Sequence, residues 1–64
     1  MSKILQNLKS KYENDVEMAK TNIQMFLEKS VGVAERIDYA STIITELEKI
    51  AHAKDMLEAL NELD

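Results

Sequence analysis

Three side chains that could bind a metal or transfer protons share one face of a helical stretch. Glu48, His52 and Asp55 are spaced four and three residues apart, which brings them to the same side of a helix. Rows of carboxylate and imidazole ligands can hold Zn²⁺ or iron. Di-iron bundles, however, use Glu-x-x-His with further glutamates that face inward, whereas this row lies among polar residues typical of a solvated face. We therefore expect no metal site.

The remaining nucleophiles and loops do not form a catalytic pattern. His52 is the only histidine and there is no cysteine, and the spacing places no imidazole beside Ser30, Ser41 or Thr42 to act as a base. Gly32 is the only glycine, so a glycine-rich phosphate loop is excluded. The sequence predicts that the protein is not an enzyme, with no catalytic residues and no cofactor.

Nucleic-acid binding is the alternative function, as a small dimeric RNA-binding regulator. It would rest on the basic residues of the first half of the chain, which are Lys3, Lys9, Lys11, Lys20 and Lys29. These lysines scatter around a helix instead of forming a stripe, and Arg36 is the only arginine. The net charge of −4 also opposes binding to phosphates. We therefore expect no nucleic-acid partner.

Length and composition indicate one small all-α domain over residues 1–64. A chain of 64 residues without cysteine has no disulfides to stabilise a small core, so it needs good helix packing or a partner subunit. One glycine and no proline favour long helices. No segment has the length of a signal peptide or a membrane span, and the polar faces are not rich in lysine. We expect a cytoplasmic protein that does not bind membranes.

A first helix is predicted over about residues 3–30. Apolar residues recur at helical spacing along one face, at Leu5, Leu8, Tyr12, Val16, Ala19, Ile23 and Phe26. Ser2 is suited to cap the start of this helix and Lys29 suits its carboxyl end. Met18 and Met25 fall seven residues apart and away from this face, so they either flank the core or are simply exposed, or they contact another subunit or partner.

A short connector over about residues 31–36 predicts an antiparallel hairpin. Gly32 suits a left-handed cap at the end of the first helix, and Asp38 suits the first turn of the next. Connectors of this length join antiparallel neighbours. Residues 1–31 carry five lysines against four acidic residues, whereas residues 32–64 carry three basic against eight acidic residues. A hairpin brings the basic start beside the acidic end.

The second helix is predicted over about residues 37–62, with a coiled-coil pattern. Two rows repeat every seven residues: Ala40, Leu47 and Lys54, continued by Asn61, and Ile43, Ile50 and Leu57. The flanking apolar residues change sides near Ala51–Lys54. Either this helix supercoils about its partner, or it contacts different helices at its two ends, or it breaks near His52.

The apolar surface exceeds what one pair of helices can cover, which predicts self-association. We expect a homodimer that closes into a four-helix bundle, with a larger assembly or docking on another protein as open alternatives. The protein would then be an interaction or structural module. The candidate interface residues are Met18, Met25, Tyr39, Ile43, Ile50, Lys54, Met56, Leu57 and Leu60.

Two segments resemble parts of a known group of proteins. Ser30-Val31-Gly32-Val33-Ala34-Glu35 and Ala51-His52-Ala53-Lys54-Asp55-Met56-Leu57-Glu58 are similar to segments of short uncharacterised proteins of T4-like tailed phages, including marine cyanophages. Those relatives are expected to open their second helix with His-Pro, where Arg36-Ile37 stands here. The resemblance implies an accessory or structural role for a virus in the host cytoplasm. It implies no activity and no site residue.

Overall fold

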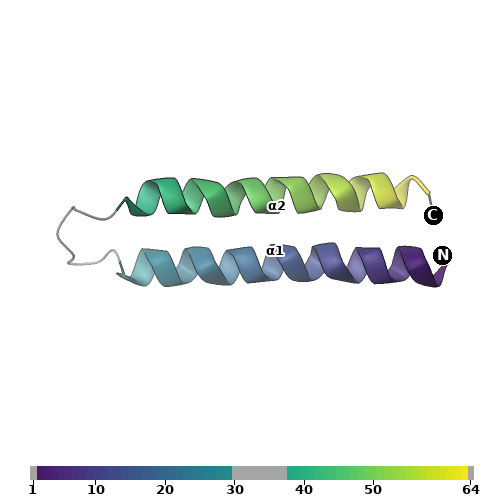
Figure 1. Ribbon diagram of the computed structural model, residues 1–64, viewed down its shortest axis with the longest axis horizontal. Coiled ribbons are helices and arrows are strands. Elements are labelled where there is room, and N and C mark those ends of the chain that lie inside the picture. The colour runs from purple at the N-terminus through teal and green to yellow at the C-terminus, as the bar shows by residue number, and fades with distance from the viewer. Residues whose placement is uncertain (1, 30–37, 64) are drawn as a thin grey trace.

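The chain folds into two long antiparallel helices that lie side by side. The computed structural model describes residues 2–29 and 38–63. In these ranges α1 spans Lys3–Lys29 and α2 spans Tyr39–Asn61, and the two chain ends lie at the same end of the hairpin (Figure 1). The predicted all-α hairpin is confirmed. The prediction that Gly32 ends the first helix lies outside the described residues.

Each helix begins at a side-chain cap. The Oγ of Ser2 accepts a hydrogen bond from the backbone N–H of Leu5 at 3.2 Å, as predicted. Asp38 was expected inside the second helix, but it precedes α2 and its carboxylate accepts a hydrogen bond from the N–H of Ser41 at 2.9 Å. The N–H groups of the first turn have no partner within the helix, so a carboxylate outside it fixes its start.

The contact face of α1 is close to the predicted one. Val16 and Ala19 are buried, and Leu5, Tyr12, Ile23 and Phe26 are half-buried against α2. Leu8 is the exception, since it stays exposed near the open end of the hairpin. The rings of Phe26 and Tyr39 pack against each other with centroids 6.2 Å apart, near the connector.

The contact face of α2 differs from the prediction in one of its two rows. Ile43, Ile50 and Leu57 are half-buried, as expected for a row that meets α1. The neighbouring row is not Ala40, Leu47 and Lys54, all of which are exposed. The row that meets α1 is instead the set one residue earlier, here called the central row of α2: Tyr39, Glu46, Ala53 and Leu60.

Glu46 explains why the central row of α2, and not the predicted row, meets α1. The predicted row placed Leu47 inside because a leucine is buried more often than a glutamate. In the structure the Glu46 carboxylate finds partners inside the contact, so it can occupy the central row. Small Ala53, next in the same row, lets the helices approach closely and is itself buried.

α2 runs unbroken past His52, which excludes the predicted alternative of a break there. Neither α1 nor α2 has the length and the apolar character that a membrane-crossing helix requires. The ion pairs found within residues 2–29 and 38–63 each lie within a single helix, so the basic start and the acidic end lie near each other without ion pairs between the helices.

Candidate interaction surfaces

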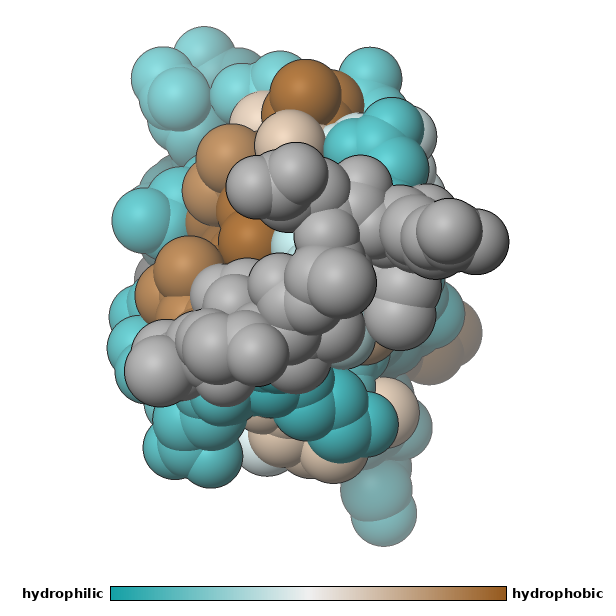
Figure 2. All heavy atoms as spheres, turned by 90° about the vertical axis from the view of Figure 1, so that its left-hand side faces the viewer, coloured by the Kyte–Doolittle hydropathy of each residue, from teal (hydrophilic) through white to brown (hydrophobic). Residues whose placement is uncertain are grey.

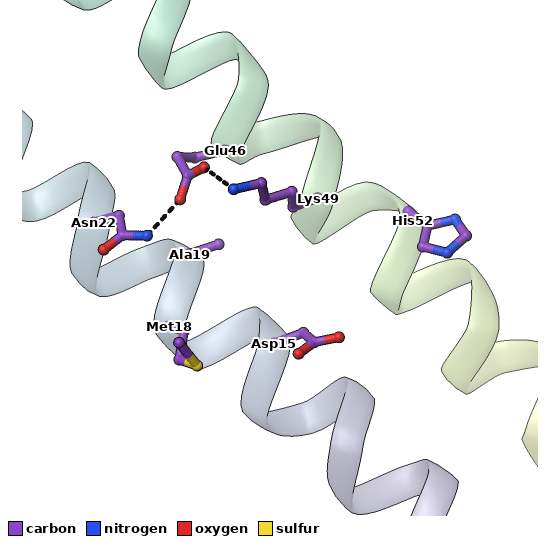
Figure 3. A pocket seen from close by; sticks show the side chains of 7 residues that line it. All are labelled: Asp15, Met18, Ala19, Asn22, Glu46, Lys49 and His52. Carbon is purple, nitrogen blue, oxygen red and sulfur yellow. Dashed lines mark hydrogen bonds and ion pairs between the residues drawn. The ribbon is translucent and has the colours of Figure 1, made fainter.

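A polar cluster joins the two helices near the middle of the hairpin. The side-chain amide of Asn22 on α1 donates a hydrogen bond of 2.6 Å to Oε1 of Glu46 on α2. The Nζ of Lys49, one turn further along α2, lies 2.7 Å from the other oxygen, Oε2 (Figure 3). Only 5% of Glu46 is exposed. Both carboxylate oxygens are therefore engaged, which makes burial of this charge tolerable.

The same contacts change the acidity of Glu46. The hydrogen bond from the Lys49 ammonium, followed by the one from the Asn22 amide, holds the pKa of the Glu46 carboxyl below its ordinary value of 4.5. Burial acts in the opposite direction but is outweighed. Glu46 therefore stays ionised in the folded hairpin at neutral pH.

A shallow groove of about 310 Å³ runs beside this cluster, between the helices. The residues that line it, here called the polar groove, are Asp15, Met18, Ala19, Asn22, Glu46, Lys49 and His52 (Figure 3). At one end His52 meets the ring of Tyr12 edge-on, with centroids 6.2 Å apart. The groove carries charges of both signs, and its deepest charged groups already bind one another.

The row considered for metal binding does not converge on a site. Glu48, His52 and Asp55 are all exposed on α2. Across residues 2–29 and 38–63, no group of three or more His, Asp or Glu side chains is arranged to hold a metal ion. The contact that His52 makes is with an aromatic ring on α1 rather than with a carboxylate.

A second surface, largely apolar, lies on the side of the hairpin away from the polar groove. Successive residues are turned by about 100° around a helix axis. The residue three positions after a given residue therefore lies to one side of it, and the residue four positions after it lies to the other side. Since Lys49 lines the groove, Ile50 lies on the other side of α2, and since Asn22 lines the groove, Ile23 lies on the other side of α1. The residues of this surface, here called the apolar face, are Ile23, Leu27, Ile43, Ile44, Leu47 and Ile50.

Half of the apolar face is open to solvent. Leu27, Ile44 and Leu47 are exposed, and 51% of Leu47 is accessible. Figure 2 looks on to the connector end and shows brown, apolar side chains gathered mainly on the left-hand side of this view. The exposed residues Leu27, Ile44 and Leu47 lie in the half of the hairpin next to the connector.

The other half of this same side, towards the chain ends, is charged. Lys9 and Glu13 on α1 and Lys54 and Glu58 on α2 follow the same helical positions along it, and all four are exposed. None of them has an ion-pair partner among the residues that the structure describes. The side opposite the polar groove is therefore divided lengthwise into an apolar half and a charged half.

The predicted interface residues fall into three environments. Met18 and Met25 are exposed on the groove side of α1, and Lys54 is exposed on the apolar-face side of α2. Leu60 is buried between the helices, so little of its surface remains for a second chain. The others are half-buried in the hairpin contact: Tyr39, Ile43, Ile50, Met56 and Leu57.

The lysines of α1 do not line up as a basic stripe. Lys11 forms an ion pair with Asp15 at 2.9 Å and lies over the ring of Tyr12, and this pairing raises the pKa of Lys11 above 10.5. Lys20 lies 3.5 Å from Glu17. Two of the α1 lysines are therefore neutralised locally.

Sequence reasoning missed the polar cluster of Asn22, Glu46 and Lys49. A signal was present, because the row of Tyr39, Glu46, Ala53 and Leu60 also repeats every seven residues and is apolar at every position except one. Its partner Asn22 could not be identified from spacing, since spacing within α2 says nothing about which residue of α1 lies opposite.

Comparison with known proteins assigns no family to the chain. No protein-family model, no curated protein sequence and no solved structure matches it.

Proposed function

We propose that this protein works by self-association, as a helical hairpin of which two copies close into a four-helix bundle. The bundle would serve as an interaction or structural module. The observation that carries the proposal is how little the hairpin buries alone. Within the described ranges the buried apolar residues are Val16, Ala19, Ala53 and Leu60, and half of these are alanines. A core this small is marginal for a chain of this size.

The apolar side chains left outside supply the reason to associate. Eight large ones in the described part of the chain are 37% to 72% exposed. Covering a leucine or isoleucine contributes roughly 1.5–3 kcal/mol. Two such residues, Ile44 and Leu47, are one turn apart on α2, and Leu27 lies on the same side of α1. A contiguous exposed apolar surface marks an association site.

The proposal is tested by measuring mass and thermal stability over a concentration series. Light scattering should give twice the chain mass of 7.3 kDa. The Tm followed by circular dichroism should rise between about 1 and 100 µM, because a dimer gains ~1.4 kcal/mol for each tenfold increase in concentration. A monomeric mass with full helicity and a Tm independent of concentration would contradict self-association.

No observation on the described residues favours the RNA-binding alternative. The pairing of Lys11 with Asp15 and of Lys20 with Glu17 leaves no continuous basic row on α1. Phosphate binding needs such a row and strengthens as salt is lowered. A gel-shift series with single-stranded and double-stranded RNA should therefore show no salt-sensitive complex. A complex that weakens in a Lys9→Gln, Lys29→Gln double variant would revive the alternative.

A further inference from the structure

The pattern of charged and apolar residues on the side opposite the polar groove favours one arrangement of a second copy. Resting on the proposed self-association, we infer that the two hairpins pack through this side with their connectors at the same end, about a two-fold axis parallel to the helices. In this arrangement α1 of each copy lies against α2 of the other. The polar groove of each copy faces away from its partner.

The register of the hairpin supplies a rule for testing this arrangement. Tyr12 lies beside His52, Asn22 beside Glu46 and Phe26 beside Tyr39. The numbers of these paired residues add to between 64 and 68. A two-fold axis along the helices leaves every residue at its own level, so the same rule holds between α1 of one copy and α2 of the other.

The charged half of the surface is self-complementary under this rule. Lys9 lies level with Glu58 of the second copy, since their numbers add to 67. Glu13 lies level with Lys54 of the second copy by the same sum. All four side chains are exposed and without an ion-pair partner in the described hairpin. The symmetry forms each of these opposite-charge pairs twice.

The apolar half is self-complementary as well. Ile23 lies level with Ile44 of the second copy, and Leu27 with Ala40. Lys20 lies level with Leu47, where its aliphatic stem can cover the leucine while its ammonium reaches solvent. Apart from Lys20 against Leu47, apolar residues thus meet apolar residues near the connector, and charges meet opposite charges near the chain ends.

The other two-fold arrangement loses this match. With the connectors at opposite ends, α2 runs antiparallel to α2 of the second copy about the midpoint of the helix. About this midpoint, near Ile50, Leu47 lies level with Ala53, one residue from Lys54, and Ile44 lies level with Met56, two residues from Glu58. Lys54 and Glu58 would then lie near the apolar side chains of Leu47 and Ile44 without the opposite charges that Glu13 and Lys9 offer them in the first arrangement.

The surface is large enough for a stable dimer. The hairpin measures 50 by 14 Å across its Cα atoms in the plane of the two helices. The flat outline of this side is therefore roughly 700 Å², of the same order as the ~800 Å² of accessible surface that each partner buries in a standard protein interface.

Spin labels at the two ends of α1 distinguish the arrangements, and the absence of cysteine makes single labels simple to introduce. The variants are Lys29→Cys, near the connector, and Lys3→Cys, near the chain ends; both positions are exposed. Double electron–electron resonance should give a label-to-label distance below about 30 Å for each variant, since helix axes in a bundle are ~10 Å apart. Distances of about 40 Å or more, the length of α1, would show connectors at opposite ends and overturn the inference.

The outcomes separate the arrangement from self-association itself. Long distances in samples of dimeric mass contradict only the arrangement. A monomeric mass for the unlabelled wild type contradicts the proposed function as well.

Charge reversal provides the second arm of the experiment. Glu13→Lys should weaken the dimer about tenfold, because the two-fold axis turns two favourable pairs into repulsive ones. Adding Lys54→Glu should restore the dissociation constant to within about threefold. Glu48→Lys makes the same charge change on the outer side of α2 and should leave dimerisation unchanged. Failure of the double variant to recover would show that Glu13 does not meet Lys54.

Discussion

The Glu46 carboxylate shows how a charged residue can occupy a contact row. It stands where coiled-coil packing expects an apolar side chain, and it is held there by Asn22 across the contact and by Lys49 on its own helix. Such groups add little net stability but disfavour alternative registers. Sliding α2 by seven residues in one direction would replace Asn22 by Asp15, with a charge of the same sign as Glu46.

The lowered pKa of Glu46 predicts a specific dependence of stability on pH. Since the folded state favours the carboxylate, its contribution is fully present above the ordinary pKa of 4.5 and is lost as the pH falls through the lower folded-state value. The Tm of the wild type should therefore fall more between pH 7 and pH 3 than the Tm of Glu46→Gln, which cannot titrate. Thermal denaturation of both proteins at matched concentration measures the difference.

A matched variant tests whether that effect belongs to the buried carboxylate. Glu48→Gln removes an exposed carboxylate two residues away on the same helix. It should follow the wild-type pH profile. Identical profiles for the wild type and Glu46→Gln would mean that the contacts of Glu46 contribute nothing to stability.

At the scale of the helices, the sequence was sufficient to predict the elements and their antiparallel order. The apolar spacing of α1 from Leu5 to Phe26 is that of a single helical face, and the structure confirms it. The start of α2 was predicted about two residues too early, because Asp38 was assigned to the first turn of the helix, whereas it caps the helix from outside. The cap depends on a hydrogen bond to the N–H of Ser41, which forms only once the helix exists.

The Asp38 cap should make a measurable contribution to stability. Asp38→Ala removes the acceptor for the Ser41 N–H and should lower the free energy of unfolding by about 1 kcal/mol. A urea titration followed by circular dichroism measures it, with Asp38→Asn as the control that keeps a capping side chain. An unchanged midpoint in Asp38→Ala would show that the cap is not formed in solution.

The contact row of α2 was the part that sequence could not settle. Both Leu47 and Glu46 belong to rows that repeat every seven residues, and burial preference favoured Leu47. The decisive partner, Asn22, lies on the other helix. Pairing across helices depends on register, and register is a property of the folded hairpin rather than of either helix alone.

At the scale of the whole molecule, the exposure of Leu47 enlarges the apolar surface that the hairpin presents to a partner. Had Leu47 been in the hairpin contact, the side away from the polar groove would be less apolar. With Glu46 inside, Leu47 joins Leu27 and Ile44 on an exposed surface. The burial of the Glu46 charge and the exposure of Leu47 therefore have the same cause, which is the side of α2 that faces α1.

The self-association proposed here is tested most directly by comparing two substitutions of equal chemistry on opposite sides of the hairpin. Leu47, on the apolar face, and Met18, beside the polar groove, are exposed to similar extents, 51% and 58%. Each is replaced by glutamate, a good helix former. Sedimentation equilibrium then gives the dimer dissociation constant of each variant.

Leu47→Glu should raise that constant at least tenfold, because two leucines lose roughly 1.5–3 kcal/mol of burial each, which outweighs the ~1 kcal/mol or less that each new glutamate gains from Lys20 of the second copy. Met18→Glu should remain dimeric like the wild type. A dimer that tolerates Leu47→Glu, or one that is lost instead in Met18→Glu, would contradict association through the apolar face.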